Sequence, residues 1–160
     1  MLLTLLRHAT AELQGTTESD FSRVLINKGF SQTERVANYC KRNKLDADLL
    51  LSSPYPRAKQ TAKHLKKHWS ACPEPELADW LKLGSGSQAI LAGLSSRVHL
   101  SADISVILVL HEPDISELLA TLLNTDADNF DIKKASLTQI QLVSDNRAIL
   151  NWTIPCSQMY

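Results

Sequence analysis

Three short apolar segments constrain the fold of this chain more than any other feature. They are residues 1–6 ("MLLTLL"), the run within "DLLLSS" at 48–53, and residues 105–110 ("SVILVL"). Each has the length and bulk of a strand that is buried on both faces, as parallel strands in α/β proteins are. Helical patterns separate the segments, so the sequence predicts strands that alternate with helices around one sheet.

The helical patterns carry recognisable start signals. In "SQTERVANYCKRNK", Ser31 and Glu34 have the spacing of a capping box. Proline is favoured in the first turn of a helix, and Pro54 and Pro113 each follow an apolar segment. We therefore expect helices over residues 31–44, from Pro54, over about 87–98, and from Pro113.

The remaining segments complete the predicted architecture. Residues 70–88 are rich in Pro, Gly and Ser and predict a loop, with a short strand near 76–78. Residues 136–143 and 148–154 read as two strands joined by a tight turn at 144–147. The prediction is one domain over residues 1–160, a three-layer α/β/α fold with a mostly parallel central sheet.

Composition excludes several classes of function. The 17 basic and 17 acidic residues balance, which argues against binding of nucleic acid or an anionic membrane through bulk charge. The three cysteines form no CxxC pair or metal-ligand spacing, so we expect neither a disulfide framework nor a zinc site. Residues 1–6 are too short for a signal sequence or a membrane span. We expect a cytoplasmic monomer.

Polar residues follow all three apolar segments. Arg7 and His8 end the first, Ser52 and Ser53 end the second with Arg57 shortly after, and His111 ends the third. Ligands bind at the carboxyl edge of α/β sheets, where helix N-termini also gather. Two arginines and two histidines at that edge predict a pocket for a phosphoryl group. A histidine there can attack phosphorus, and the arginines stabilise the transition state without a metal.

Four stretches together resemble a known family. "LLRHATAE", "SSPYPRAKQTA" and "LVLHEPDISEL" are similar, in order, to the three motifs of the histidine phosphatase superfamily, also called phosphoglycerate-mutase-like. "DFSRVLINKG" resembles a segment of its short branch, the SixA-type phosphohistidine phosphatases. The resemblance implies that His8 is the nucleophile, that Arg7 and Arg57 hold the phosphoryl oxygens, and that His111 stabilises the transition state. It places Arg23 near the pocket as an additional arginine, and it implies no metal or other cofactor.

The resemblance and the length of the chain bear on the substrate. A chain of 160 residues leaves little room for the lid that longer relatives place over small metabolites. This favours phosphohistidine presented by a signalling protein, such as the phosphotransfer domain of a phosphorelay. Asp79 and Glu12 are candidate proton donors, and neither matches the family pattern securely. Two alternatives stay open: a small-molecule phosphomonoesterase or sugar phosphatase of the same superfamily, and a catalytically silent module that binds phosphoproteins.

Several other residues have both a functional and a structural interpretation. His64 and His68 have metal-ligand spacing, but the neighbouring lysines favour a solvated basic face, which would suit an acidic partner. His99 and the three cysteines are interpreted as structural. Two positions depart from the family pattern. Leu110, before the third-motif histidine, would either crowd the pocket or point into the core, and Ile26 replaces a threonine whose hydroxyl would cap or hydrogen-bond locally.

Overall fold

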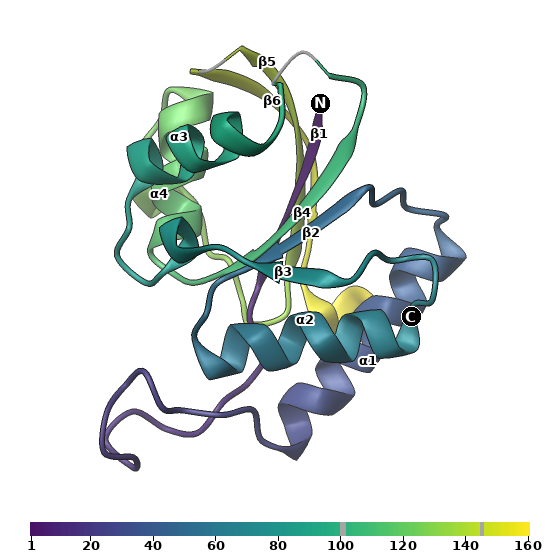
Figure 1. Ribbon diagram of the computed structural model, residues 1–160, viewed down its shortest axis with the longest axis vertical. Helices are drawn as coiled ribbons and strands as arrows, with labels where there is room; N and C mark the ends of the chain where they lie inside the picture. The colour runs from purple at the N-terminus through teal and green to yellow at the C-terminus, as the bar shows by residue number, and fades with distance from the viewer. Residues whose placement is uncertain (100–101, 145) are drawn as a thin grey trace.

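The computed structural model describes residues 1–99, 102–144 and 146–160, which form one mixed sheet flanked by helices (Figure 1). The strand order is β3-β2-β4-β1-β5-β6. The first four of these pair in parallel, and β5 and β6 are antiparallel. The strands are β1 (Leu2–Arg7), β2 (Leu49–Ser52), β3 (Pro75–Leu77), β4 (Ser105–Leu110), β5 (Leu137–Ser144) and β6 (Arg147–Ile154). The predicted fold class is confirmed.

Helices cover both faces of the sheet (Figure 1). Two apolar clusters sit between the layers, one beneath α1 and α2 and the other beneath α3 and α4. The α-helices are α1 (Asn27–Arg42), α2 (Pro56–His68), α3 (Ser87–Arg97) and α4 (Asp114–Leu123). Short 3₁₀ helices are η1 (Asp79–Leu81), η2 (Ala127–Asn129) and η3 (Cys156–Gln158).

The central strand β4 shows why its sequence is apolar throughout. Successive side chains point to opposite faces, so Ile107 and Val109 pack under α1 and α2 while Leu108 and Leu110 pack under α3 and α4. Each fully buried side chain of this size contributes about 1.5–3 kcal/mol. Leu110 is fully buried in the core, which decides between the two sequence-based readings of that position.

The start of α1 differs from the prediction. The helix begins at Asn27, so Ser31 lies inside it and the predicted capping box is wrong. Gly29, in the first turn, is packed so closely on the chain after β1 that a Cβ atom there would overlap the Thr10 carbonyl oxygen. This tertiary contact places the helix start. The N-cap is Ile26, with extended φ and ψ of −94° and 170° and no side-chain hydrogen bond to the helix.

The start of α2 also differs, by two residues. Pro56 occupies the first turn, and Pro54 precedes the helix. Tyr55, between the two prolines, has φ of −58° and ψ of 133°. A residue that precedes proline is kept out of the helical region by steric clash, so the helix cannot include Tyr55. Arg57 nonetheless lies in the first turn of the helix, as predicted. Pro113 precedes α4 as its N-cap.

The remaining elements lie close to their predicted positions. β3 occupies the loop-rich region where a short strand was expected, and α3 ends at Arg97. The tight turn expected at 144–147 includes residue 145, which lies outside the described residues. Among the described residues, no helix is both long and apolar enough to cross a membrane.

We expect Ile26→Thr to stabilise the protein. Ile26 has N-cap geometry and is 41% exposed, and its carbonyl accepts the N–H groups of Gly29 and Phe30. Its side chain offers no oxygen to the other N–H groups of the first turn. A threonine hydroxyl there should raise the free energy of unfolding by about 1 kcal/mol, measured by urea denaturation. Ile26→Val, which matches threonine in shape, is the control. Equal stability of the Thr and Val variants would contradict this interpretation.

Candidate active site

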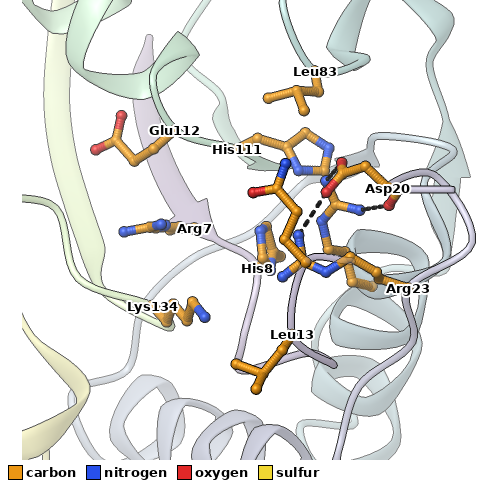
Figure 2. Close-up of a pocket in the computed structure, with 11 residues that line it drawn as sticks. Arg7, His8, Leu13, Asp20, Arg23, Leu83, His111, Glu112 and Lys134 are labelled. Atoms are coloured by element: carbon orange, nitrogen blue, oxygen red, sulfur yellow. Dashed lines mark hydrogen bonds and ion pairs between the residues drawn. The ribbon is translucent and has the colours of Figure 1, made fainter. Parts of the chain in front are cut away.

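The carboxyl ends of β1, β2 and β4 meet around a cavity of about 410 Å³ (Figure 2). All five residues predicted for the site line it, although they come from distant parts of the sequence. They are Arg7, His8, Arg23, Arg57 and His111. The parallel sheet brings together strand ends that lie about a hundred residues apart in the sequence. The five residues therefore lie around one cavity, as the sequence predicts.

His8 is held rigidly at the end of β1. Its Nδ1 lies 2.8 Å from the carbonyl oxygen of Ala9, and the Ala9 N–H donates to Thr61 Oγ1 of α2 at 3.1 Å. The side chain is only 5% exposed, and this burial holds the pKa of His8 well below its ordinary value. A neutral ring that donates Nδ1–H to Ala9 keeps a lone pair on Nε2. That is the form in which a histidine attacks phosphorus.

His111 faces His8 from the end of β4, with ring centroids 5.1 Å apart. Its Nε2 lies 2.8 Å from Ser53 Oγ. Burial, reinforced by the charge of Arg57, lowers the pKa of His111 to about 3. Nδ1 is buried without a hydrogen-bond partner among the described residues. When the Ser53 hydroxyl donates to Nε2, the proton of the neutral ring sits on Nδ1. Sequence reasoning did not identify this role for Ser53.

An aspartate links two of the arginines. Arg57, 2% exposed, donates to the Asp20 carbonyl at 2.7 Å and to Asp20 Oδ2 at 2.9 Å. Arg23 donates to Asp20 Oδ1 at 2.7 Å (Figure 2). The hydrogen bond from Arg23, with the charge of Arg57, holds the pKa of Asp20 below its ordinary value. Asp20 is therefore a charged carboxylate inside a cationic site. Its position in "DFSR" is the only signal of this role in the sequence.

Arg7 and Lys134 form another wall of the cavity (Figure 2). Arg7 donates to the Ile132 carbonyl at 2.6 Å, which fixes one end of its guanidinium. Lys134 is half-buried, and burial together with the charge of Arg7 lowers its pKa. Nothing in the sequence pointed to Lys134, since the segment before β5 carries no motif. Its place in the site comes from the pairing of β5 with β1.

The two candidate proton donors lie outside this cavity. Asp79 is exposed and pairs with Lys82 at 3.0 Å, while a carboxylate oxygen of Glu12 accepts the Val24 N–H at 3.0 Å. The carboxylates that line the cavity are Asp20 and Glu112. The Glu112 carboxylate accepts hydrogen bonds from the N–H and the hydroxyl of Ser116, at 3.1 and 2.8 Å.

The histidine pair on α2 lies apart from the cavity. The rings of His64 and His68 are 4.4 Å apart, His64 packs edge-on against Phe30, and His68 Nδ1 lies 3.8 Å from Glu34. No group of three or more potential metal ligands occurs in the described parts of the chain. The three cysteines are buried and free. Burial raises the pKa of Cys40 and of Cys72 to about 12, which suits packing and opposes thiolate chemistry.

The buried histidines should make stability depend on pH. The pKa of His111 is about 3 in the folded chain and near 6.5 when exposed, so between these values the unfolded chain binds more protons. The contribution of neutral His111 to the free energy of unfolding is therefore complete above pH 6.5 and is lost as the pH falls toward 3. The free energy of unfolding of His111→Gln should therefore fall less steeply with pH than that of the wild type. The two slopes should differ by up to about 1.4 kcal/mol per pH unit, measured by urea denaturation from pH 7 to pH 4.5. Parallel curves for the two proteins would refute this.

Comparison with known proteins agrees with this geometry. The family model of the histidine phosphatase superfamily (branch 1) matches residues 3–82. An uncharacterized protein of Picosynechococcus sp. is 29% identical, over 97% of this chain and all of that protein. The structure of the protein histidine phosphatase SixA complexed with tungstate has a TM-score of 0.88, with 22% identity and full coverage of both chains.

Two further structures are similar in fold. A putative phosphohistidine phosphatase SixA from Agrobacterium tumefaciens has a TM-score of 0.80 with 23% identity, covering 96% of this chain and 97% of that one. A phosphoserine phosphatase mutant from Entamoeba histolytica has a TM-score of 0.74 with 16% identity, covering 99% of each chain. The matched family segment contains four of the five predicted site residues, Arg7, His8, Arg23 and Arg57. The chain belongs to the histidine phosphatase superfamily, and this membership supports a phosphatase.

Proposed function

We propose that this protein hydrolyses phosphohistidine on a signalling protein in the cytoplasm, without a metal, through a phosphorylated His8. The observation that carries the proposal is the state of the two carboxylates in the cavity. Asp20 is ion-paired with two arginines, and Glu112 is engaged as a hydrogen-bond acceptor. Neither is poised to give a proton to an alcohol leaving group.

In the first proposed step, the phosphoryl group lies among the arginines and His111, and the lone pair of His8 Nε2 attacks phosphorus. The N–P bond of the substrate breaks, and its electron pair goes to the departing imidazole. That imidazole takes a proton from solvent at its other ring nitrogen before it leaves, so the ring departs neutral. Arg7, Arg57 and His111 stabilise the charge on the transferring oxygens.

In the second proposed step, a water oxygen attacks the phosphorus of phosphorylated His8. The bond from phosphorus to Nε2 breaks, and the electron pair returns to the ring. Inorganic phosphate leaves, and a proton from the water passes to solvent or to phosphate. The hydrogen bond between His8 Nδ1–H and Ala9 holds the ring in one orientation through both steps.

The choice of phosphohistidine over a phosphomonoester rests on the leaving group. An alkoxide is a poor leaving group and usually needs an enzyme acid, whereas a protonated imidazole leaves readily. The low pKa of Asp20 keeps that carboxylate charged at neutral pH, so it is not such an acid. The similarity in fold to the protein histidine phosphatase SixA and to a putative phosphohistidine phosphatase SixA also supports the proposal.

We expect wild-type protein to release phosphate from a ³²P-labelled phosphohistidine protein faster than from a panel of phosphomonoesters. His8→Ala should lower that rate by about 10³-fold or more, because the nucleophile is gone. EDTA should leave the rate unchanged, since arginines replace a metal in stabilising the phosphoryl oxygens.

Each contrary outcome of this assay has a distinct meaning. Turnover of monoesters alone would favour the small-molecule phosphatase. Binding of phosphoproteins with no turnover of either substrate would favour the catalytically silent module. Strong inhibition by EDTA would overturn the metal-free mechanism.

We expect Asp20→Asn to bind inorganic phosphate more tightly than the wild type. The Asp20 carboxylate shares Arg57 and Arg23 with any incoming anion, so removing its charge should lower the dissociation constant about tenfold, ~1.4 kcal/mol. Isothermal titration calorimetry with phosphate measures this directly. Asp79→Asn, which removes an exposed carboxylate outside the cavity, is the matched control. Weaker binding by Asp20→Asn would mean that Asp20 serves to hold the arginines in place.

A further inference from the structure

A second cavity, of about 380 Å³, adjoins the catalytic one and shares Arg7 and Lys134 with it. We call it the lysine groove, after Lys28, Lys133 and Lys134 in its walls. Thr10 and other uncharged residues supply the rest of the lining, and none of the described residues that line the groove is acidic. In a chain whose formal charges balance, this is a local excess of positive charge beside the proposed phosphoryl site.

The individual lysines reinforce this charge. Lys28 is exposed on the first turn of α1, and Lys134 is half-buried. The pKa of Lys134 is lowered by burial and by the charges of Arg7 and Lys28, so these cations repel one another. Lys133 pairs with Asp131 at 2.5 Å, but both side chains are mostly exposed, and such pairs are weak. An anion in the groove would relieve the repulsion.

Another cavity that Arg7 lines has the reverse charge. Its lining includes Glu112, Asp128 and Asp131, and Asp131 is the partner of Lys133. Arg7 thus lines both a basic groove and an acidic cavity. A ligand with negative charge on one side of its phosphoryl group is therefore favoured in one orientation only, because the acidic cavity repels it.

Exposed apolar side chains near the catalytic cavity favour a protein ligand. Leu13, in the cavity wall, is 73% exposed. Phe21, 49% exposed, packs edge-on against Tyr55, whose ring in turn packs against His111. A sugar phosphate offers little apolar surface to cover these side chains, whereas a protein surface does.

We infer that the lysine groove docks an acidic stretch of the phosphorylated protein, on one side of its phosphohistidine. This inference rests on the proposed function and deepens it, since it names a feature of the substrate. The groove supplies long-range attraction and orientation, while the catalytic cavity holds the phosphoryl group. Lys28 and Lys133 line only the groove, so they can be changed without touching the catalytic cavity.

The test uses four substrates: two phosphohistidine peptides of equal length, one flanked by glutamates and one by lysines, free phosphohistidine, and a sugar bisphosphate. We expect wild-type kcat/KM to be about tenfold higher for the glutamate peptide in low salt, and the preference to shrink as salt screens the charges. The double variant Lys28→Glu/Lys133→Glu should abolish or reverse the preference and lower hydrolysis of free phosphohistidine far less than that of the glutamate peptide. Lys63→Glu/Lys67→Glu, which makes the same change on α2, should keep the wild-type preference.

Three outcomes would overturn the inference. Equal kcat/KM for the two peptides is the first, and a glutamate preference that survives the groove variant is the second. In the third, the wild type shows no preference between the peptides and the groove variant loses hydrolysis of the sugar bisphosphate. That result would assign the groove to small anionic metabolites. Failure of the proposed function is separate, because then wild-type protein hydrolyses no phosphohistidine substrate. Binding of an unphosphorylated glutamate-rich peptide, followed by fluorescence anisotropy, tests the groove in that case also, with the two double variants as before.

Discussion

The pairing of β1 with β4 is the constraint on which the site depends. The strands run parallel with Arg7 opposite Leu110, and the His8 N–H donates to the Leu110 carbonyl at 3.0 Å. This register puts His8 and His111 at the same level of the sheet, with their rings in contact. A slip of one residue would turn the apolar side chains of β1 to the wrong faces, so core packing enforces the register. The geometry of the two histidines is thus set by the core.

The positive charges of the site repel one another, and the fold reduces this repulsion in several ways. The two histidines stay neutral because burial opposes their protonation, which removes two potential charges. Asp20 neutralises part of the charge of Arg57 and Arg23. Arg7 is anchored on a backbone carbonyl and has no ion-pair partner among the described residues. The result is a preorganised cationic cavity, the arrangement that stabilises a phosphoryl group in transfer.

Several features followed from sequence because they depend on local rules. The apolar runs of β1, β2 and β4 predicted buried parallel strands, and the polar residues after them predicted the shared edge. Leu110 belonged to an unbroken apolar run and lies in the core accordingly. The helix starts were less predictable: the extended Tyr55 between two prolines delays α2, and the close approach of Gly29 to Thr10 moves the start of α1.

The sequence by itself determined the fold class, the edge of the sheet that carries the site, and the five residues gathered there, because strand patterns and motif order are written locally. Only the tertiary structure decided what surrounds those residues. Asp20 binds Arg57 from the loop after β1, and Ser53 contacts His111 because they follow the neighbouring strands β2 and β4. Lys134 lies in the cavity wall because its segment leads into β5, which pairs with β1. It also placed Asp79 and Glu12 outside the cavity, and Lys28 beside Lys133 in the lysine groove. These are contacts between residues far apart in the chain, and no local pattern encodes the distance between such residues.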